Sequence, residues 1–82
     1  MYAIEFTQLA NKQLHDLDAN SRERIEGVLE RIKFNPYHYV QRLVGDTAYR
    51  LRVGDYRVII DIKETKLLIL VIRLGHRKNI YN

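Results

Sequence analysis

The hydrophobic spacing of this 82-residue chain changes once, and the change limits the folds open to it. Between residues 7 and 32, apolar side chains recur at the three- and four-residue intervals of amphipathic helices. From Ala48 onward they alternate with other side chains, which is the period of strands. A chain with these two patterns in this order is expected to pack helices against a sheet.

The N-terminal region predicts a strand followed by a helix. Residues 2–6 alternate and are rich in β-forming side chains, so we expect a short strand there. Thr7 is a residue type that caps helices, and the leucines and alanine that follow it lie near helical spacing. A first helix is therefore expected over residues 7–17.

A second helix is predicted to begin at Asn20. Glu23 follows Asn20 at the spacing of a capping box, and apolar side chains then recur at i, i+3, i+4 and i+7. Pro36 disfavours helical backbone in the residue before it, so the helix should end near Phe34. Residues 36–47 show no steady period and are expected to be a connection, which leaves the two helices as a hairpin.

Three strands are predicted in the second half of the chain, over residues 48–53, 56–62 and 66–73. The resulting order, β-α-α-β-β-β, predicts an α+β fold in which a helix hairpin packs on one face of a small, mostly antiparallel sheet. A chain of this length can bury one hydrophobic core, so residues 1–82 are expected to form a single domain.

The charge is distributed unevenly along the chain. The formal net charge is +4, and residues 46–82 carry all of this excess, because they hold eight basic and only four acidic side chains. Such asymmetry is typical of proteins that bind polyanions, although solubility alone also favours it. The chain has no cysteine, no signal-peptide-like start and no apolar run long enough to span a bilayer, so we expect a cytoplasmic protein.

The predicted hairpin around residues 54–55 sorts the side chains of its strands. Alternation turns apolar side chains toward the helices and turns Arg50, Arg52 and Arg57 toward the opposite face, with Arg52 directly opposite Arg57. Opposed like charges destabilise a sheet by about 0.2–1 kcal/mol, so folding gives no reason to choose them. Phosphate binding gives one, because the arginine fork suits phosphate. The alternative is a solvated face whose arginines pair with Asp61 or Glu64.

The histidines do not form a recognisable metal site. His15 is expected in the first helix, His38 in the connection and His76 in the last segment, without an HExxH motif or a cluster of ligand-type side chains. Phosphate-binding loops and the G-x-S-x-G motif are also absent. A catalyst on this chain is therefore expected to use arginine, tyrosine and at most a histidine, with no metal or other cofactor.

Two stretches of the sequence resemble the RelE/ParE superfamily of toxins. The first is YRLRVGDYRVII at residues 49–60, and the second is GHRKNIY at residues 75–81. The length and the predicted order of elements are similar too, so the resemblance covers nearly the whole chain. It implies a RelE-like toxin of a type II toxin–antitoxin system that cleaves mRNA in the ribosomal A site. It also implies cleavage without metal, with the RNA 2′-hydroxyl as nucleophile, and inhibition by a RelB-like antitoxin.

The resemblance implies roles for five residues. Arg50 and Arg52 match two basic residues of the family's second strand, Arg57 an arginine of the third, Arg77 an arginine after the fourth, and Tyr81 a C-terminal tyrosine. The arginines would neutralise the scissile phosphate, and Tyr81 would orient a base or assist proton transfer. Some relatives carry lysine at the first two positions. Because arginine holds its proton more firmly, charge stabilisation is expected there rather than proton abstraction.

Lys78 and His76 are expected to contact RNA beside this set, and His76 is a further candidate for carrying a proton. The alternative for His76 is an exposed histidine of the tail. The alternative for Tyr81 is an aromatic side chain that anchors the tail to the core. The general base is left unassigned.

Two other functions and one partner are also considered. ParE-like relatives share the fold but poison DNA gyrase and generally lack the arginine and tyrosine set, whereas a non-catalytic RNA-binding domain would only hold phosphates. The last two strands leave four apolar side chains on the face opposite the helices: Ile59, Leu68, Leu70 and Ile72. Either an amphipathic antitoxin segment or the C-terminal tail should cover them.

Overall fold

The computed structural model describes residues 1–80 and contains two helices that pack on one five-stranded sheet. The elements in chain order are β1 (Ala3–Phe6), α1 (Gln8–His15), α2 (Ala19–Ile32), β2 (Val40–Arg42), β3 (Tyr49–Val53), β4 (Tyr56–Lys63) and β5 (Leu68–His76). The strand order is β1-β5-β4-β3-β2, with β1 and β5 parallel and the other neighbours antiparallel. Neither helix is long and apolar enough to cross a membrane.

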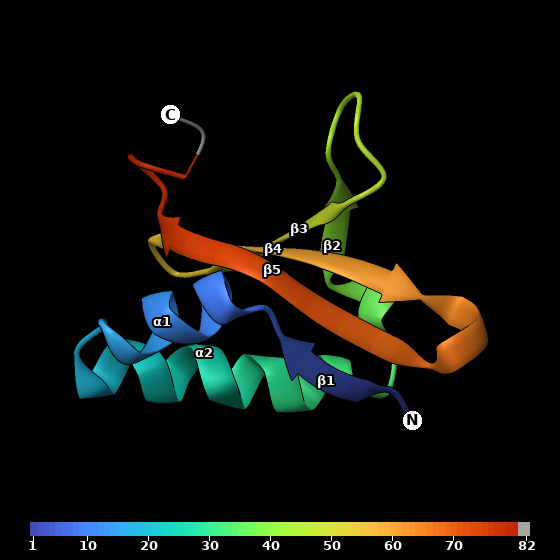
Figure 1. Ribbon diagram of the computed structural model, residues 1–82, viewed down its shortest axis with the longest axis horizontal. Coiled ribbons are helices and arrows are strands. Elements are labelled where there is room, and N and C mark those ends of the chain that lie inside the picture. Colours follow the sequence, from blue (N-terminus) through green and yellow to red (C-terminus); the bar gives the residue numbers. More distant parts are fainter. Residues whose placement is uncertain (81–82) are drawn as a thin grey trace.

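Both helices lie on one side of the sheet, whereas the β2–β3 loop and residues 77–80 after β5 rise from the other side (Figure 1). We call the first side the helix face. The second side, which carries Arg50, Arg52, Arg57 and Ile59, is called the open face. This arrangement confirms the predicted α+β class and the predicted order of elements. It adds one strand, β2, inside the expected connection, where three residues are too short a run to show alternation.

The helices begin at side-chain caps. Thr7 caps α1 as predicted, because its Oγ1 accepts the N–H of Ala10 at 3.1 Å. The predicted cap of α2 was wrong: Asp18, not Asn20, accepts the N–H of Ser21 at 3.1 Å, so the helix begins at Ala19. The hydrogen bonds with Ser21 lower the pKa of Asp18. Two competing cap residues two positions apart explain the error, since both types have high capping preference.

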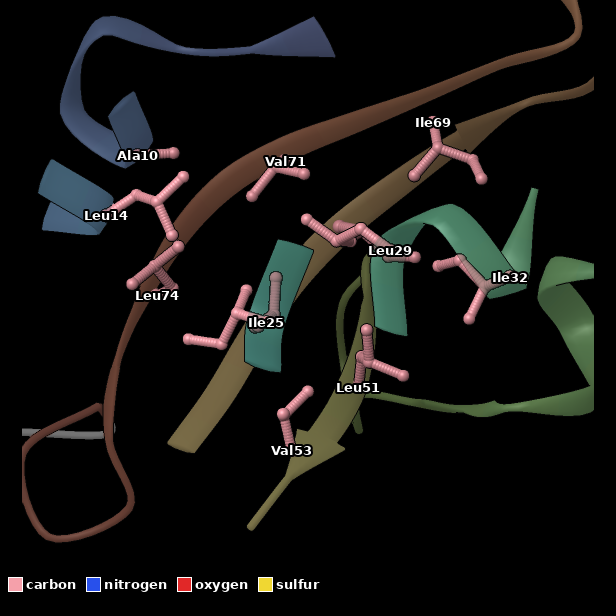
Figure 2. Close-up of a cluster of buried hydrophobic side chains, with 12 residues drawn as sticks. Ala10, Leu14, Ile25, Leu29, Ile32, Leu51, Val53, Ile69, Val71 and Leu74 are labelled. Carbon is pink, nitrogen blue, oxygen red and sulfur yellow. The ribbon is translucent and has the colours of Figure 1, made fainter. Parts of the chain in front are cut away.

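The hydrophobic core fills the space between the helices and the helix face of the sheet (Figure 2). Twelve buried side chains form it: Ala10, Leu14, Ile25, Leu29, Ile32, Leu51, Val53, Val58, Ile60, Ile69, Val71 and Leu74. Full burial of one side chain of this size is worth about 1.5–3 kcal/mol, so this layer is the main source of stability. It also fixes which side chains of each strand face away from the helices.

A β-bulge in β5 changes which side chains reach the open face. Ile60 of β4 pairs with Val71, and the residue before it, Ile59, pairs with Arg73. Ile72 is therefore an extra residue between the two pairs. Strict alternation from Val71 would turn Arg73 toward the helices. The bulge instead turns Leu74 into the core and Arg73 to the open face, and the strand runs to His76, three residues beyond its predicted end.

A second, smaller cluster covers part of the open face. Ala48, Ile59 and Ile80 are buried there, with Leu43 and Ile72 packed against them. The β2–β3 loop and the segment after β5 thus cover two of the four apolar side chains that the sequence left without a partner. The other two, Leu68 and Leu70, are half-buried.

The turn between β3 and β4 requires glycine at position 54. Gly54 has φ of +58°, and a Cβ there would lie 2.7 Å from Nη1 of Arg24 on α2. We expect Gly54→Ala to lower the free energy of unfolding by about 1–2 kcal/mol, because a side chain is strained in left-handed backbone. Urea denaturation measures this.

Gly27→Ala is the matched control, since the same Cβ would meet nothing within 4 Å on the exposed side of α2. That change should raise the free energy of unfolding by about 0.5–1 kcal/mol. Equal effects of the two substitutions would contradict the assigned turn geometry.

Candidate functional site

Arg50 and Arg52 reach the open face because they lie two residues apart on β3, between side chains that enter the core. Arg50 is half-buried and donates a hydrogen bond from Nη2 to Oε1 of Gln41 on β2. Arg52 is exposed, and within residues 1–80 its guanidinium forms no hydrogen bond or ion pair. Of these two arginines, Arg52 is therefore the one whose guanidinium is exposed to solvent.

Arg57 lies directly opposite Arg52, as predicted, but it is buried, with 8% of its surface exposed. Its Nη1 donates to the carbonyl oxygens of Gly54 at 2.9 Å and Tyr56 at 2.8 Å. On its other side the paired residue of β5 is Gly75, which has no side chain to compete for the space. Arg57 thus holds the β3–β4 turn and adds a fixed positive charge beside Arg52.

The alternative in which acidic residues neutralise this face is not observed. Asp61 lies 3.3 Å from Nζ of Lys63, and Glu64 accepts hydrogen bonds from the hydroxyls of Tyr2 and Tyr37. Within residues 1–80 neither carboxylate forms an ion pair with an arginine of β3 or β4. Within residues 1–80, these two carboxylates are thus engaged by lysine and tyrosine side chains and not by the arginines of β3 and β4.

Arg73 is a fourth arginine of the open face, and the sequence analysis did not find it. The bulge brings it into one row across the sheet with Ile59 and Arg50. Two strand spacings, about 10 Å, separate its backbone from that of Arg50. The sequence holds one signal. Regular alternation would turn Arg73 toward the core and the apolar Leu74 away from it, and a β-bulge reverses this assignment.

The segment after β5 is a turn over residues 77–80 that brings Arg77 and Lys78 to the same end of the sheet. The backbone N–H of Arg77 donates to the carbonyl of Asp55 at 2.8 Å, and its Nε lies 3.9 Å from Oδ1 of Asp55. Both side chains of this ion pair are more than half exposed. The C-terminal turn is thereby tied to the β3–β4 turn, beside Arg52 and Arg57, and Lys78 is exposed next to it.

His76 ends β5 and is half-buried, so it is not the exposed tail histidine of the alternative interpretation. Its ring packs edge-to-face on Tyr56, with centroids 5.7 Å apart, and its Nδ1 accepts the N–H of Lys78 at 3.2 Å. An acceptor Nδ1 carries no proton, so Nε2 is the nitrogen that could exchange one. Tyr81, the remaining residue of the predicted set, lies outside the described residues.

The shifted tyrosines lie at the other end of the sheet, around Glu64. The hydrogen bond to Glu64 raises the pKa of Tyr2 to about 12, with smaller contributions from partial burial and charge. Partial burial and then the hydrogen bond to Glu64 raise the pKa of Tyr37. These hydroxyls stay neutral donors that hold the β4–β5 turn. Among residues 1–80 no three histidine, aspartate or glutamate side chains are grouped closely enough to hold a metal ion.

The fold and this face define a class of protein: a small α+β domain whose sheet buries one side under helices and presents arginines on the other. Comparison with known proteins gives the family. Residues 4–81 match the family model described as the ParE toxin of type II toxin–antitoxin systems, parDE. The chain therefore belongs to this family of toxins, within the RelE/ParE superfamily that the sequence resembles.

Individual relatives are RelE proteins. A Methanocaldococcus jannaschii protein named as a candidate toxin, RelE1, is 26% identical over 85 residues, which cover 98% of this chain and 94% of the relative. The RelE–RelB complex of Pyrococcus horikoshii has a TM-score of 0.82 at 25% identity and covers 95% of this chain and 97% of that chain. The intact RelBE complex of E. coli has a TM-score of 0.79 at 25% identity and covers 93% and 96%.

Arg57 is buried and Arg52 is exposed, so the two arginines should contribute differently to the free energy of unfolding. Arg57→Met should lower the free energy of unfolding by about 1.5–3 kcal/mol, because it removes hydrogen bonds from a charged donor to two carbonyls. Arg52→Met makes the same chemical change at an exposed position and should stay within about 0.5 kcal/mol of the parent. Equal losses from both variants, measured by urea denaturation, would refute the assignment of Arg57 to the turn.

Proposed function

We propose that this toxin is a RelE-type endoribonuclease that cleaves mRNA in the ribosomal A site without a metal ion. The observation that carries the proposal is the set of arginines on the open face. Within residues 1–80 the guanidinium of Arg52 is unpaired, and an ion pair with Asp55 holds Arg77 next to the β3–β4 turn. The similarity to RelE proteins of two archaea and E. coli supports it.

The proposed reaction is an internal transfer of the phosphodiester. The RNA 2′-oxygen attacks the adjacent phosphorus, the bond from phosphorus to the 5′-oxygen breaks, and the products are a 2′,3′-cyclic phosphate and a 5′-hydroxyl. One proton leaves the 2′-hydroxyl and one reaches the 5′-oxygen, so no other reactant is consumed. Negative charge grows on the phosphoryl oxygens, and guanidinium groups held in place stabilise it without reorganising.

The arginines would divide this work according to their surroundings. Arg52 and Arg77 are exposed and would contact the phosphates directly, with Lys78 and Arg50 extending the contact. Arg57, fixed by two carbonyls, would add charge from the neighbouring strand. Because each of these arginines keeps its proton, proton transfer would fall to other groups, with Tyr81 and Nε2 of His76 as candidates from this chain.

A RelB-like antitoxin is the proposed partner. The comparison proteins of P. horikoshii and E. coli are in complexes of RelE with RelB. On this chain, Leu68 and Leu70 stay half-buried after the tail has covered Ile59 and Ile72. An amphipathic antitoxin segment would cover this remaining apolar strip, whose paired residues on β4 are Lys63 and Asp61.

A second candidate is inhibition of DNA gyrase, and the match to the ParE toxin family model favours it. The two functions differ in their target. Purified toxin should cut mRNA in translating ribosomes, seen by primer extension, and should leave free RNA nearly intact. Inhibition of gyrase supercoiling without any mRNA cuts would favour the second candidate. Salt-sensitive RNA binding without products would favour a non-catalytic RNA-binding domain.

The cleavage rate on ribosomes should depend on the open face and not on total charge. We expect Arg52→Ala and Arg77→Ala each to reduce the single-turnover rate by about 10²–10³-fold, because each removes a cation aimed at the developing phosphoryl charge. Arg31→Ala is the control: Arg31 is exposed in the last turn of α2, so the variant loses the same charge from the helix side. An unchanged rate for Arg77→Ala would overturn the site, as would an equal loss for Arg31→Ala.

A further inference from the structure

Arg24 reaches the β3–β4 turn from the helix side of the molecule. It is an exposed residue of α2, directly before the core residue Ile25. A Cβ on Gly54 would lie 2.7 Å from Nη1 and 3.0 Å from Cζ of Arg24, and the start of α2 and this turn lie at the same end of the molecule (Figure 1). The guanidinium therefore occupies the space that the glycine leaves open and lies against the backbone of the turn.

The charge of Arg24 is not neutralised by the neighbouring acidic residue. Within residues 1–80 the guanidinium of Arg24 forms no hydrogen bond or ion pair. The acidic residue of the turn, Asp55, pairs with Arg77 instead, with Oδ1 and Nε 3.9 Å apart. Arg24 is thus a cation that rests on backbone and stays available to an external anion.

Arginines from four parts of the chain meet at this turn. Arg24 comes from α2 and Arg52 from β3. Arg57 lies on β4, and Arg77 follows β5 directly. Nη1 of Arg57 donates at 2.9 Å to the carbonyl of Gly54, the same residue against which Arg24 lies. Like charges that are brought together repel one another, so this arrangement opposes folding and suits a bound polyanion.

We propose that Arg24 is an additional RNA-binding residue, which holds a backbone phosphate next to the scissile one where the RNA strand leaves the open face across the β3–β4 turn. This inference rests on the proposed ribonuclease function. It extends the RNA path from the open face to the start of α2, and it assigns a role to a residue outside the predicted set. Arg24 acts on a flanking phosphate, so its contribution is to RNA affinity.

The binding test uses Arg24→Gln and a single-stranded RNA with 2′-O-methyl groups, which cannot be cleaved. Its affinity, measured by fluorescence anisotropy at 0.1 M salt and below, should fall about 3–10-fold, because one phosphate contact is lost. The slope of log affinity against log salt concentration should fall in magnitude by about 0.7, the value for one phosphate of a single strand. Thermal unfolding checks that the variant is folded.

Arg31→Gln is the matched control. Arg31 lies seven residues after Arg24, so it is on the same face of α2 but about 10 Å farther along the helix, away from the turn. The variant loses the same charge, yet at 0.1 M salt its affinity should stay within about twofold of the wild type, since that distance is one screening length. Equal affinities of the Arg24 and Arg31 variants for the RNA would overturn the inference.

Cleavage on ribosomes separates this inference from the proposed function. Arg24→Gln should raise the toxin concentration that gives half the maximal single-turnover rate, whereas Arg52→Ala should lower the maximal rate itself. A loss on ribosomes without any loss of affinity for the free strand would assign the contact to ribosomal RNA and overturn its place beside the scissile phosphate. If the wild type fails to cut mRNA while Arg24→Gln still weakens RNA binding, the proposed cleavage is overturned and the phosphate contact is supported.

Discussion

The packing of two helices against one face of the sheet is the constraint on which the other features depend. Once α1 and α2 pack against the sheet and twelve side chains are buried between the two layers, alternation decides which side chains of β3 and β4 face away from the helices, and a β-bulge adjusts the direction in β5. A one-residue slip would exchange arginines for core leucine and valine, at a cost far above the stability of a small domain. The open face is therefore specified as strongly as the core is, although it contributes little to stability itself.

The open face carries two kinds of arginine: some are held in place by backbone carbonyls, and others are exposed and can contact an anion. Arg57 is held by two carbonyls of the β3–β4 turn, and Arg73 by the carbonyl of Ile80. Arg52 is exposed, and within residues 1–80 the side chain of Arg77 is joined only to an exposed aspartate, so both can be recruited by an anion with little loss. Such a division suits catalysis by electrostatic stabilisation, because buried charges stay in place while exposed ones meet the substrate. It also gives a physical reason for opposed arginines that folding alone would disfavour.

The sequence predicted the class of fold and the element order from the change between helical spacing and alternation, and the pairing of Arg52 with Arg57 from the alternation itself. It could not predict features that depend on local competition or irregularity. Asp18 displaced Asn20 as the cap of α2, since both side chains suit that role. The bulge at Ile72 moved Arg73 to the open face, and the side chains of Thr7 and Gln13, about 60 residues earlier, hold the backbone on either side of it. The burial of Arg57 is likewise a property of the folded turn.

The proposed function requires that RNA bind the open face. Its most direct test is NMR mapping of the amide groups that shift when a short RNA with 2′-O-methyl groups, which cannot be cleaved, is added at low salt. We expect shifts concentrated in β3 around Arg52, at the β3–β4 turn and over residues 73–80, with the outer surface of α1 unchanged. Shifts confined to the helices, with β3 and residues 73–80 unperturbed, would contradict it.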